Sequence, residues 1–160
     1  MISDGKPILD ACCGSRMFWF DKDNPMADFM DIRDEDCYQS DGQLIMVHPN
    51  IIGDFRQIPK PDKSYKLVVF DPPHLLYCGT NSDMYKAYGR LDRSCWQETI
   101  RKGYAECMRI LDDFGILIFK WNENDVKVRD IIKATGEIPL FGHRTRRHTI
   151  WLCYMKIPHL

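Results

Sequence analysis

The feature that most constrains this chain is an apolar run that ends abruptly in an acid and two prolines. Residues 66–70 are apolar after their first lysine, and Asp71, Pro72, Pro73 and His74 follow directly. A short apolar run bounded by a turn is typical of a strand buried in a parallel sheet. Proline has no N–H to donate, so the pair stops the strand. We therefore expect an acid and an imidazole at a strand's carboxyl end, where open α/β sheets bind ligands.

The chemistry of this turn favours a particular kind of ligand. Two prolines remove two donors, which leaves the Asp71 carboxylate and a nearby backbone carbonyl as acceptors beside the His74 ring. Acceptors next to a flat ring suit an exocyclic amino group on a planar base. A Pro-Pro pair also ends ordinary strands, so the hypothesis depends on what else lies at the same edge.

Strand and helix patterns alternate along the chain and predict a largely parallel α/β sheet. The helix that starts near Ser94 and Gln97 has a capping-box pattern, and Gly136 is expected to end the second helix. Residues 75–93 have no clear periodicity and are expected to form a long functional loop, while 44–47 is ambiguous. Strands are expected at 7–13, 27–32, 51–55, 66–70, 115–121 and 150–155, and helices at 96–111 and 125–134.

Composition limits the function classes. The chain has 160 residues, which predicts a single domain, and a net charge of −1, which excludes a global basic field. Seven cysteines without a C-x-x-C pair indicate reduced cytoplasmic thiols and predict neither a metal site nor a disulfide framework. No apolar run has membrane-spanning length, and residues 1–7 do not resemble a signal peptide.

Three further features precede the Asp-Pro-Pro-His turn. Residues 10–15 read Asp-Ala-Cys-Cys-Gly-Ser and form a glycine turn after the first strand, without the G-x-G-x-x-G dinucleotide pattern. Asp31 ends the second strand about 20 residues later, where related folds place a ribose-binding acid. Asp54 and Phe55 end the next extended segment. Taken singly, each is equally typical of an ordinary turn, a surface acid or a core phenylalanine.

In this order the features resemble the class I S-adenosylmethionine-dependent methyltransferases. More narrowly, the chain resembles the amino-methyltransferases of nucleic-acid bases, which carry D/N/S-P-P-Y/F/W after the fourth strand, and among these the small phage-type members. The resemblance extends from Ile8 to Met155. Two departures are the histidine at position 74 and a short N-terminal segment, and there is no room for a separate target-recognition domain.

The resemblance implies a single Rossmann-like α/β domain with a seven-stranded, mostly parallel sheet, helices on both faces and a last hairpin within residues 139–152. It implies the cofactor S-adenosyl-L-methionine. Asp31 would hold the ribose, Asp54 and Phe55 would flank the adenine, and the glycine turn would meet the methionine part. The implied cofactor residues are Asp10, Ala11, Cys12, Gly14, Ser15, Arg16, Asp31, Asp54, Phe55 and Asp71, and the implied catalytic residues are Asp71, Pro72, Pro73 and His74.

The implied substrate is a nucleic acid, with adenine N6 in DNA preferred by analogy because the motif begins with Asp. RNA bases, cytosine N4 and a cofactor-binding subunit that needs a catalytic partner stay open, as does a homodimer. Phosphate contacts are expected from Arg144, Arg146 and Arg147 with His143 and His148, or from Arg90 and Arg93 with Tyr85 and Tyr88. Solvated turns are an equally good interpretation of both groups. Lys120 and Trp121 face either the substrate or the core.

Overall fold

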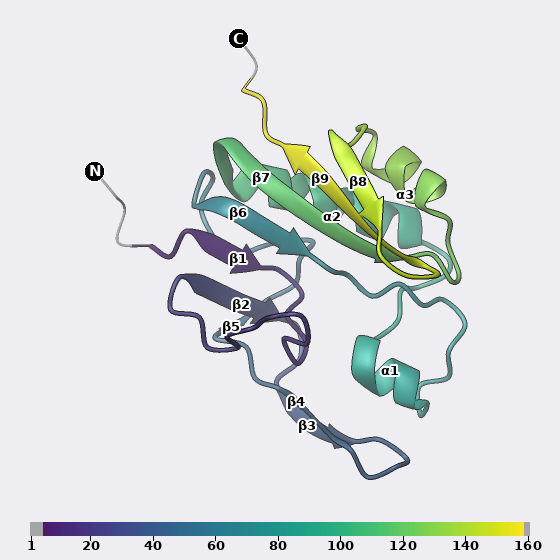
Figure 1. Cartoon of the computed structure of the whole chain (residues 1–160). Coiled ribbons are helices and arrows are strands. Elements are labelled where there is room, and N and C mark those ends of the chain that lie inside the picture. Colours follow the sequence, from purple (N-terminus) through teal and green to yellow (C-terminus); the bar gives the residue numbers. More distant parts are fainter. Residues whose placement is uncertain (1–4, 159–160) are drawn as a thin grey trace.

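Seven strands of the computed structural model, which describes residues 5–158, form one sheet (Figure 1). Residues 1–4 and 159–160 lie outside the described residues. Part of the segment 1–7, which is not expected to be a signal peptide, is among them. The strand order is β5-β2-β1-β6-β7-β9-β8, and only β9 is antiparallel to its neighbours. The predicted seven-stranded, mostly parallel sheet and its last hairpin are confirmed. The strands are β1 (Ile8–Asp10), β2 (Ala27–Asp31), β5 (Ile51–Ile52), β6 (Tyr65–Phe70), β7 (Leu111–Asn122), β8 (Phe141–Arg144) and β9 (Thr149–Met155).

The strand order reverses between β1 and β6. From β1 the chain runs outward through β2 to β5, and from β6 it runs the other way to β7. At such a switch point the loops after the two central strands turn to opposite sides and open a crevice at the carboxyl edge. The glycine turn follows β1 and Asp71 follows β6, so the topology brings the two predicted motifs to this crevice.

Two helices cover one face of the sheet. The helices α2 (Trp96–Ile110) and α3 (Val128–Thr135) pack against each other and lie behind the sheet in Figure 1. They bury Ile100 and Ile131 against Phe119 and its neighbours in the main core. Gly103 lets α2 approach closely, because a Cβ there would lie 2.6 Å from Phe55 Cδ2. The buried residues of α2 lie on one face of the helix, and this periodicity of apolar residues is what predicted the helix from the sequence.

The helix ends differ in detail from the predictions. The capping box at Ser94 is wrong: the N-cap of α2 is Cys95, with no side-chain cap, and Ser94 Oγ instead donates to Asp92 Oδ1 at 2.7 Å. Serine next to an aspartate has this local alternative to capping a helix. The helix α3 starts at Val128, and its predicted end is confirmed by Gly136 in the left-handed region at φ 76°.

The opposite face of the sheet differs from the implied fold. No described helix covers it, because the link between β1 and β2, residues 11–26, is a series of turns rather than a helix. Trp19 from this link packs on Phe29 of β2, with ring centroids 4.9 Å apart. Farther along the sheet, Ile116 and Ile118 of β7 stay half-buried, whereas Leu117 and Phe119 are fully buried under the helices.

A small outlying unit projects beyond the carboxyl edge, below the sheet in Figure 1. It contains the hairpin of β3 (Glu35–Tyr38) and β4 (Leu44–Val47), together with α1 (Asp83–Tyr88). Lys86 Nζ donates to the Tyr38 carbonyl at 2.9 Å, and the Ser40 N–H donates to Asp83 at 2.8 Å. The ambiguous segment 44–47 is therefore a strand, and the predicted loop 75–93 contains a helix held by the hairpin.

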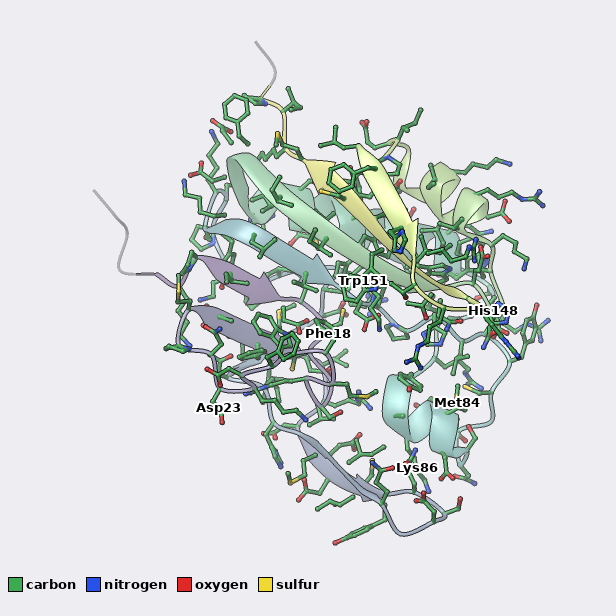
Figure 2. The ribbon with its side chains drawn as sticks, in the orientation of Figure 1. Phe18, Asp23, Met84, Lys86, His148 and Trp151 are labelled. Carbon is green, nitrogen blue, oxygen red and sulfur yellow. The ribbon has the colours of Figure 1, made fainter. Side chains whose placement is uncertain are left out.

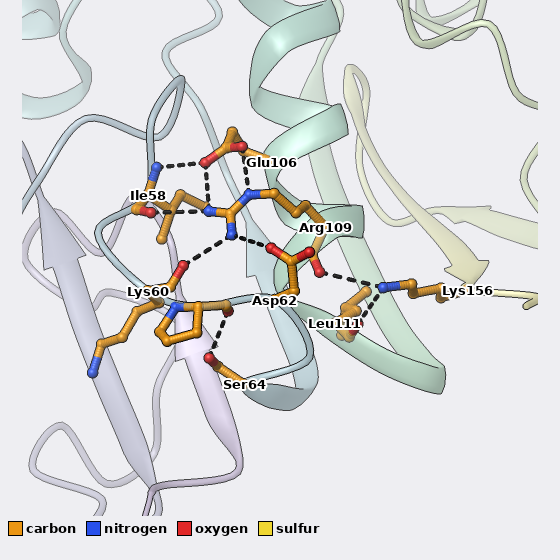
Figure 3. A network of polar contacts seen from close by, with 9 residues as sticks. Ile58, Lys60, Asp62, Ser64, Glu106, Arg109, Leu111 and Lys156 are labelled. Carbon is orange, nitrogen blue, oxygen red and sulfur yellow. Dashed lines mark hydrogen bonds and ion pairs between the residues drawn. The ribbon is translucent and has the colours of Figure 1, made fainter.

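An arginine fastens the end of α2 to the segment before β6 (Figure 3). Arg109 donates to both Glu106 oxygens at 2.7 and 2.8 Å and to Asp62 at 2.7 Å. It also donates to the carbonyls of Lys60 and Ile58 at 2.9 and 3.0 Å. These partners raise the pKa of Arg109, the Glu106 hydrogen bond contributing most, so the guanidinium stays charged.

The seven cysteines are all free, and within residues 5–158 no helix is long and apolar enough to cross a membrane. In the same range no group of three His, Cys, Asp or Glu side chains is arranged to hold a metal ion.

Candidate active-site cleft

A cleft of about 450 Å³ opens at the carboxyl edge, at the switch point between β1 and β6. Its volume is within the usual range for sites that hold a small-molecule ligand. The structure brings together segments that are far apart in sequence: the glycine turn, the ends of β2 and β5, the turn after β6, and the loop around α1. The predicted site residues that line it are Ala11, Cys12, Gly14, Ser15, Asp31, Asp54, Phe55, Asp71, Pro72, Pro73 and His74.

The glycine turn and the acid of β2 are bonded to each other. The Gly14 N–H donates to Asp31 Oδ2 at 2.9 Å, and the Arg33 backbone N–H donates to Oδ1 at 3.0 Å. Gly14 has φ 49°, a left-handed conformation that side chains disfavour, and a Cβ there would contact only Arg33 at 4.0 Å. The turn therefore offers open backbone to a ligand, and Asp31 is held at its edge.

Two of the predicted cofactor residues do not line the cleft. Asp10 is fully buried, accepting from Trp19 Nε1 at 2.7 Å and from the Cys12 N–H at 3.3 Å. Burial raises the pKa of Asp10 to about 7, against the two hydrogen bonds. Arg16 turns away to the carbonyls of Lys22 and His48 and covers the Phe29 ring. Both residues therefore hold the link between β1 and β2 by hydrogen bonds from outside the cleft.

Asp54 and Phe55 lie in the cleft but have structural partners as well. The guanidinium of Arg56 binds both Asp54 oxygens at 2.6–3.0 Å and holds the pKa of Asp54 below its usual value. The Phe55 ring stands edge-on to Phe70 of β6, with centroids 5.2 Å apart. Phe55 is thus fixed by the core and presents the rest of its ring to the cleft.

Asp71 is paired with a lysine. Lys120, near the end of β7, places its Nζ 2.7 Å from Asp71 Oδ2, and the two side chains are 26% and 22% exposed. Burial raises the pKa of Asp71, and the charge and hydrogen bond of Lys120 act in the opposite direction. Trp121, the neighbour that sequence left open, is core: it is fully buried and donates to the Val126 carbonyl.

His74 is less accessible than an exposed stacking ring would be. It is 9% exposed, with Tyr88 of α1 tilted over it at 5.4 Å and Trp121 edge-on at 6.3 Å. Burial lowers the pKa of His74 to about 4, aided by the nearby Lys120 charge, so the ring is neutral at pH 7. Tyr88 is half-buried and lines the cleft, as does Tyr85 on the same helix, so its ring is more accessible to a ligand than that of His74.

Sequence reasoning missed several cleft residues. Phe18 lies in the link after the glycine turn, and Arg33 follows β2. Neither segment has a hydrophobic periodicity from which its place in the cleft could be predicted. Phe18 meets the Trp151 ring of β9 edge-on, with centroids 5.4 Å apart (Figure 2). Lys120 was not missed: the sequence left open whether it faces the substrate or the core, and the structure places it in the cleft lining.

Some of the side chains predicted to contact phosphate already have partners within the chain. Arg144 forms an ion pair with Glu123 at 2.6 Å, and Arg93 covers the Tyr77 ring. Arg146 and Arg147 are exposed on the turn between β8 and β9, close to His148, which Figure 2 labels. Because β8 runs parallel to β7, this turn lies at the same carboxyl edge as the cleft.

No family model matches the chain, and no curated protein matches it. Solved structures do. The PH0226 protein from Pyrococcus horikoshii OT3 has a TM-score of 0.62 at 12% identity, over 97% of this chain and 84% of that one. A SAM-dependent methyltransferase from Methanosarcina mazei has a TM-score of 0.55 at 9% identity, over 99% and 95%.

A geranyl diphosphate methyltransferase, in complex with GPP and sinefungin, has a TM-score of 0.58 at 8% identity, over 98% of this chain and 73% of that one. At these identities the likeness concerns the fold alone. The sheet order and the crevice described above are therefore those of a Rossmann-like methyltransferase fold.

Proposed function

We propose that this chain is an S-adenosyl-L-methionine-dependent methyltransferase that acts on an exocyclic amino group of a nucleic-acid base, adenine N6 in DNA by preference. One observation carries the proposal: Asp71 and the Pro-Pro turn end β6 in the same cleft that Gly14 and Asp31 line from β1 and β2. A cofactor side and an acceptor side thus share one crevice, as a direct transfer requires.

The residues of the cleft fit this cofactor. Asp31 Oδ1 accepts from the backbone N–H and Nε of Arg33, while Oδ2 accepts from the Gly14 N–H alone and keeps a lone pair for a ribose hydroxyl. Phe55 offers an apolar ring, and Asp54 beside it an acceptor, for the adenine. The open backbone at Gly14 leaves space for the methionine part. When bound, the cofactor supplies a methyl group already activated on a sulfonium.

On the acceptor side, the task of the chain is to position a weak nucleophile. The lone pair of an exocyclic amine is delocalised into its ring. Asp71 Oδ1 and the Pro72 carbonyl accept the two N–H groups, which favours a pyramidal nitrogen whose lone pair points toward the methyl. After transfer the nitrogen carries a surplus proton, which passes to Asp71 or to solvent.

The aromatic wall of this site is Tyr88 rather than His74. His74 is almost fully buried, and the Tyr88 ring lies over it and lines the cleft. Gly89 packs close to Pro73, and the Leu91 N–H donates to the Leu75 carbonyl at 2.9 Å. The loop after α1 therefore lies beside the Asp-Pro-Pro-His turn. A base that enters between Asp71 and this loop stacks on Tyr88.

A second candidate is a cofactor-binding subunit that needs a catalytic partner. The sheet face without a described helix favours it, together with Phe20, which is fully exposed, and Met17, which is 63% exposed. Large exposed apolar side chains are common at interaction sites, although Met17 also lines the cleft. RNA bases and cytosine N4 remain alternatives for the substrate within the leading proposal.

The experiment is methyl transfer from labelled S-adenosyl-L-methionine to DNA, RNA and protein, followed by digestion and mass identification of the product. We expect N6-methyladenine in DNA. An Asp71→Ala variant should lose transfer and keep cofactor affinity within about twofold, because Asp71 acts on the acceptor amine. Full activity of this variant would refute the role of Asp71. Cofactor binding without any transfer by the wild type would favour the second candidate.

A further inference from the structure

One row of side chains runs from the candidate catalytic acid out to the edge of the sheet. Asp71 lies next to Lys120 of β7, Lys120 pairs with Trp151 of β9, and Trp151 pairs with His143 of β8. Phe119, one residue before Lys120, points to the opposite, helix-covered face and is fully buried. The row therefore lies on the sheet face that no described helix covers.

Lys120 has a confined position in this row. Its Nζ lies 5.4 Å from the Phe18 ring centre and 5.8 Å from the Trp151 ring centre, and 2.7 Å from Asp71 Oδ2. The two rings attract the ammonium and reduce its contact with water. Among the residues that the structure describes, Asp71 is the hydrogen-bond acceptor of this ammonium, so the pair has one defined geometry.

The other groups around Asp71 do not supply a comparable charge. From β1 come the carboxyl of Asp10 and the thiol of Cys12, both with raised pKa values to which Asp71 itself contributes. His74, in the same turn, is neutral at pH 7. Burial favours a protonated Asp71, whereas the charge and hydrogen bond of Lys120 favour the ionised form.

We propose that Lys120 is a positioning residue for the methyl transfer: it keeps Asp71 ionised and occupies Oδ2, so that Oδ1 alone receives the N–H of the acceptor amine. This inference rests on the proposed function. A protonated Asp71 would present a donor to an amine that itself donates, and a free carboxylate would offer two competing oxygens. With Lys120 in place, one oxygen in one orientation faces the cleft.

The test uses Lys120→Met, Lys120→Arg and a matched control, Lys66→Met, whose ion pair with Asp112 lies near the amino end of β6. The first readout is the pH titration of the Asp71 carboxyl carbon by NMR, assigned with Asp71→Asn. We expect the pKa of Asp71 to rise by about 1 unit or more in Lys120→Met and to stay unchanged in Lys66→Met.

The second readout is the pH profile of kcat. In Lys120→Met the acid limb should move to higher pH with the Asp71 titration, so that kcat at pH 7 falls by about 10- to 100-fold and recovers partly as the pH rises. KM for the cofactor should stay within about twofold, and Lys120→Arg should keep the wild-type limb because it keeps the charge. A purely structural role would lower kcat equally at all pH values.

The outcomes separate the two proposals. If the wild type is active and Lys120→Met keeps its Asp71 titration and pH profile, the inference about Lys120 is wrong and the proposed function stands. If the wild type transfers no methyl group to any acceptor, the proposed function fails, and the positioning role fails with it even where the titration shifts.

Discussion

At the residue scale, three aspartates end three neighbouring strands, and their surroundings give them different states. Asp31 binds backbone and Arg33, Asp71 binds Lys120, and Asp10 is sealed under Trp19. Only Asp10 combines full burial with no cationic partner among the described residues. The same residue type at equivalent strand ends therefore provides a candidate ligand group, a candidate catalytic acceptor and a buried anchor of the turn.

The buried Asp10 should make stability depend on pH. Its pKa is about 7 when folded and about 3.8 when unfolded, so the folded state binds the extra proton. The stability that this proton contributes is complete below about pH 4 and is lost as the pH rises through 7, by at most about 4 kcal/mol. In urea unfolding at pH 5 and pH 8, Asp10→Asn should show a smaller loss of stability than the wild type. The exposed Asp41→Asn should behave as the wild type, and an unchanged loss in Asp10→Asn would contradict the assignment.

Tyr88 should carry the stacking contribution in substrate binding. Removal of the ring in Tyr88→Ala should lower kcat/KM for the nucleic acid by about 10- to 100-fold, the usual worth of one base stacked on an aromatic ring. Tyr88→Phe keeps the ring and should stay near the wild type, and cofactor affinity should be unaffected in both. The control is Tyr77→Ala, since Tyr77 is 66% exposed and does not line the cleft. Equal losses in Tyr77→Ala and Tyr88→Ala would count against the role of Tyr88.

At the element scale, the Arg109 cluster joins helix α2 to the sheet on the side away from the cleft. Figure 3 shows Arg109 joining the last turn of α2 to the segment 58–64 that leads into β6. Lys156, after β9, donates to the carbonyls of Arg109 and Leu111 and so binds the same helix end. The amino ends of β6 and β7 are thus tied together on the side of the sheet away from the cleft.

Loss of the Arg109 cluster should destabilise the chain without changing the site. Arg109→Met leaves Glu106 and two backbone carbonyls without their donor, which should cost about 2 kcal/mol and lower the Tm by about 4–8 °C. Arg101→Met, on the same helix, removes only an exposed pair with Glu98 and should cost less than about 0.5 kcal/mol. Thermal unfolding of both variants measures the difference, and similar Tm values for the two would contradict the structural weight given to Arg109.

The hairpin β3–β4 and α1 form a second element-scale unit. The sequence predicted a loop for residues 75–93 and left 44–47 ambiguous, yet Ser40 and Lys86 connect the hairpin and α1 by hydrogen bonds. Because α1 carries Tyr88 at its last position, the hairpin indirectly sets the position of the aromatic wall of the cleft. Most of the exposed charge of the hairpin is acidic, so phosphate contacts are expected elsewhere at this edge.

At the scale of the whole molecule, a net charge of −1 means that the proposed nucleic-acid substrate would have to bind through a local patch. The exposed Arg146 and Arg147 on the β8–β9 turn are the candidates at the carboxyl edge. Replacing both with Ala should weaken DNA binding by about tenfold at moderate salt. It should also reduce the slope of log K for DNA binding against log salt concentration by about 2. Binding isotherms at several salt concentrations test this. Arg101→Ala with Lys102→Ala, on α2, is the charge-matched control, and an equal effect in the control would show that the turn has no special role.

The sheet itself has unequal faces. One face is sealed by α2 and α3, while the other is covered near β1 and β2 by the link with Trp19 and lies open near β7. The candidate site lies where these regions meet, with Phe18 and Trp151 beside Lys120. On the face that adjoins the site, the described residues form turns where the implied fold has helices.

The sequence by itself determined the sheet and the order of the motifs along it. Apolar runs ending in a glycine turn, an acid or Asp-Pro-Pro-His are local patterns, because strand burial and proline chemistry act within a few residues. These patterns predict a largely parallel sheet, and the resemblance to the methyltransferase family implied its seven strands and most of the residues that line the cleft. Gly136 as a helix end was predictable for the same local reason.

Only the tertiary structure decided which polar groups meet. Asp71 and Lys120 are 49 residues apart, and nothing local predicts their pairing. The burial of Asp10 and the ring of Tyr88 over His74 likewise depend on how the link and α1 fold back on the sheet. Charge state and accessibility are set by such long-range contacts, which is why two residues assigned to the cofactor, Asp10 and Arg16, lie outside the cleft lining.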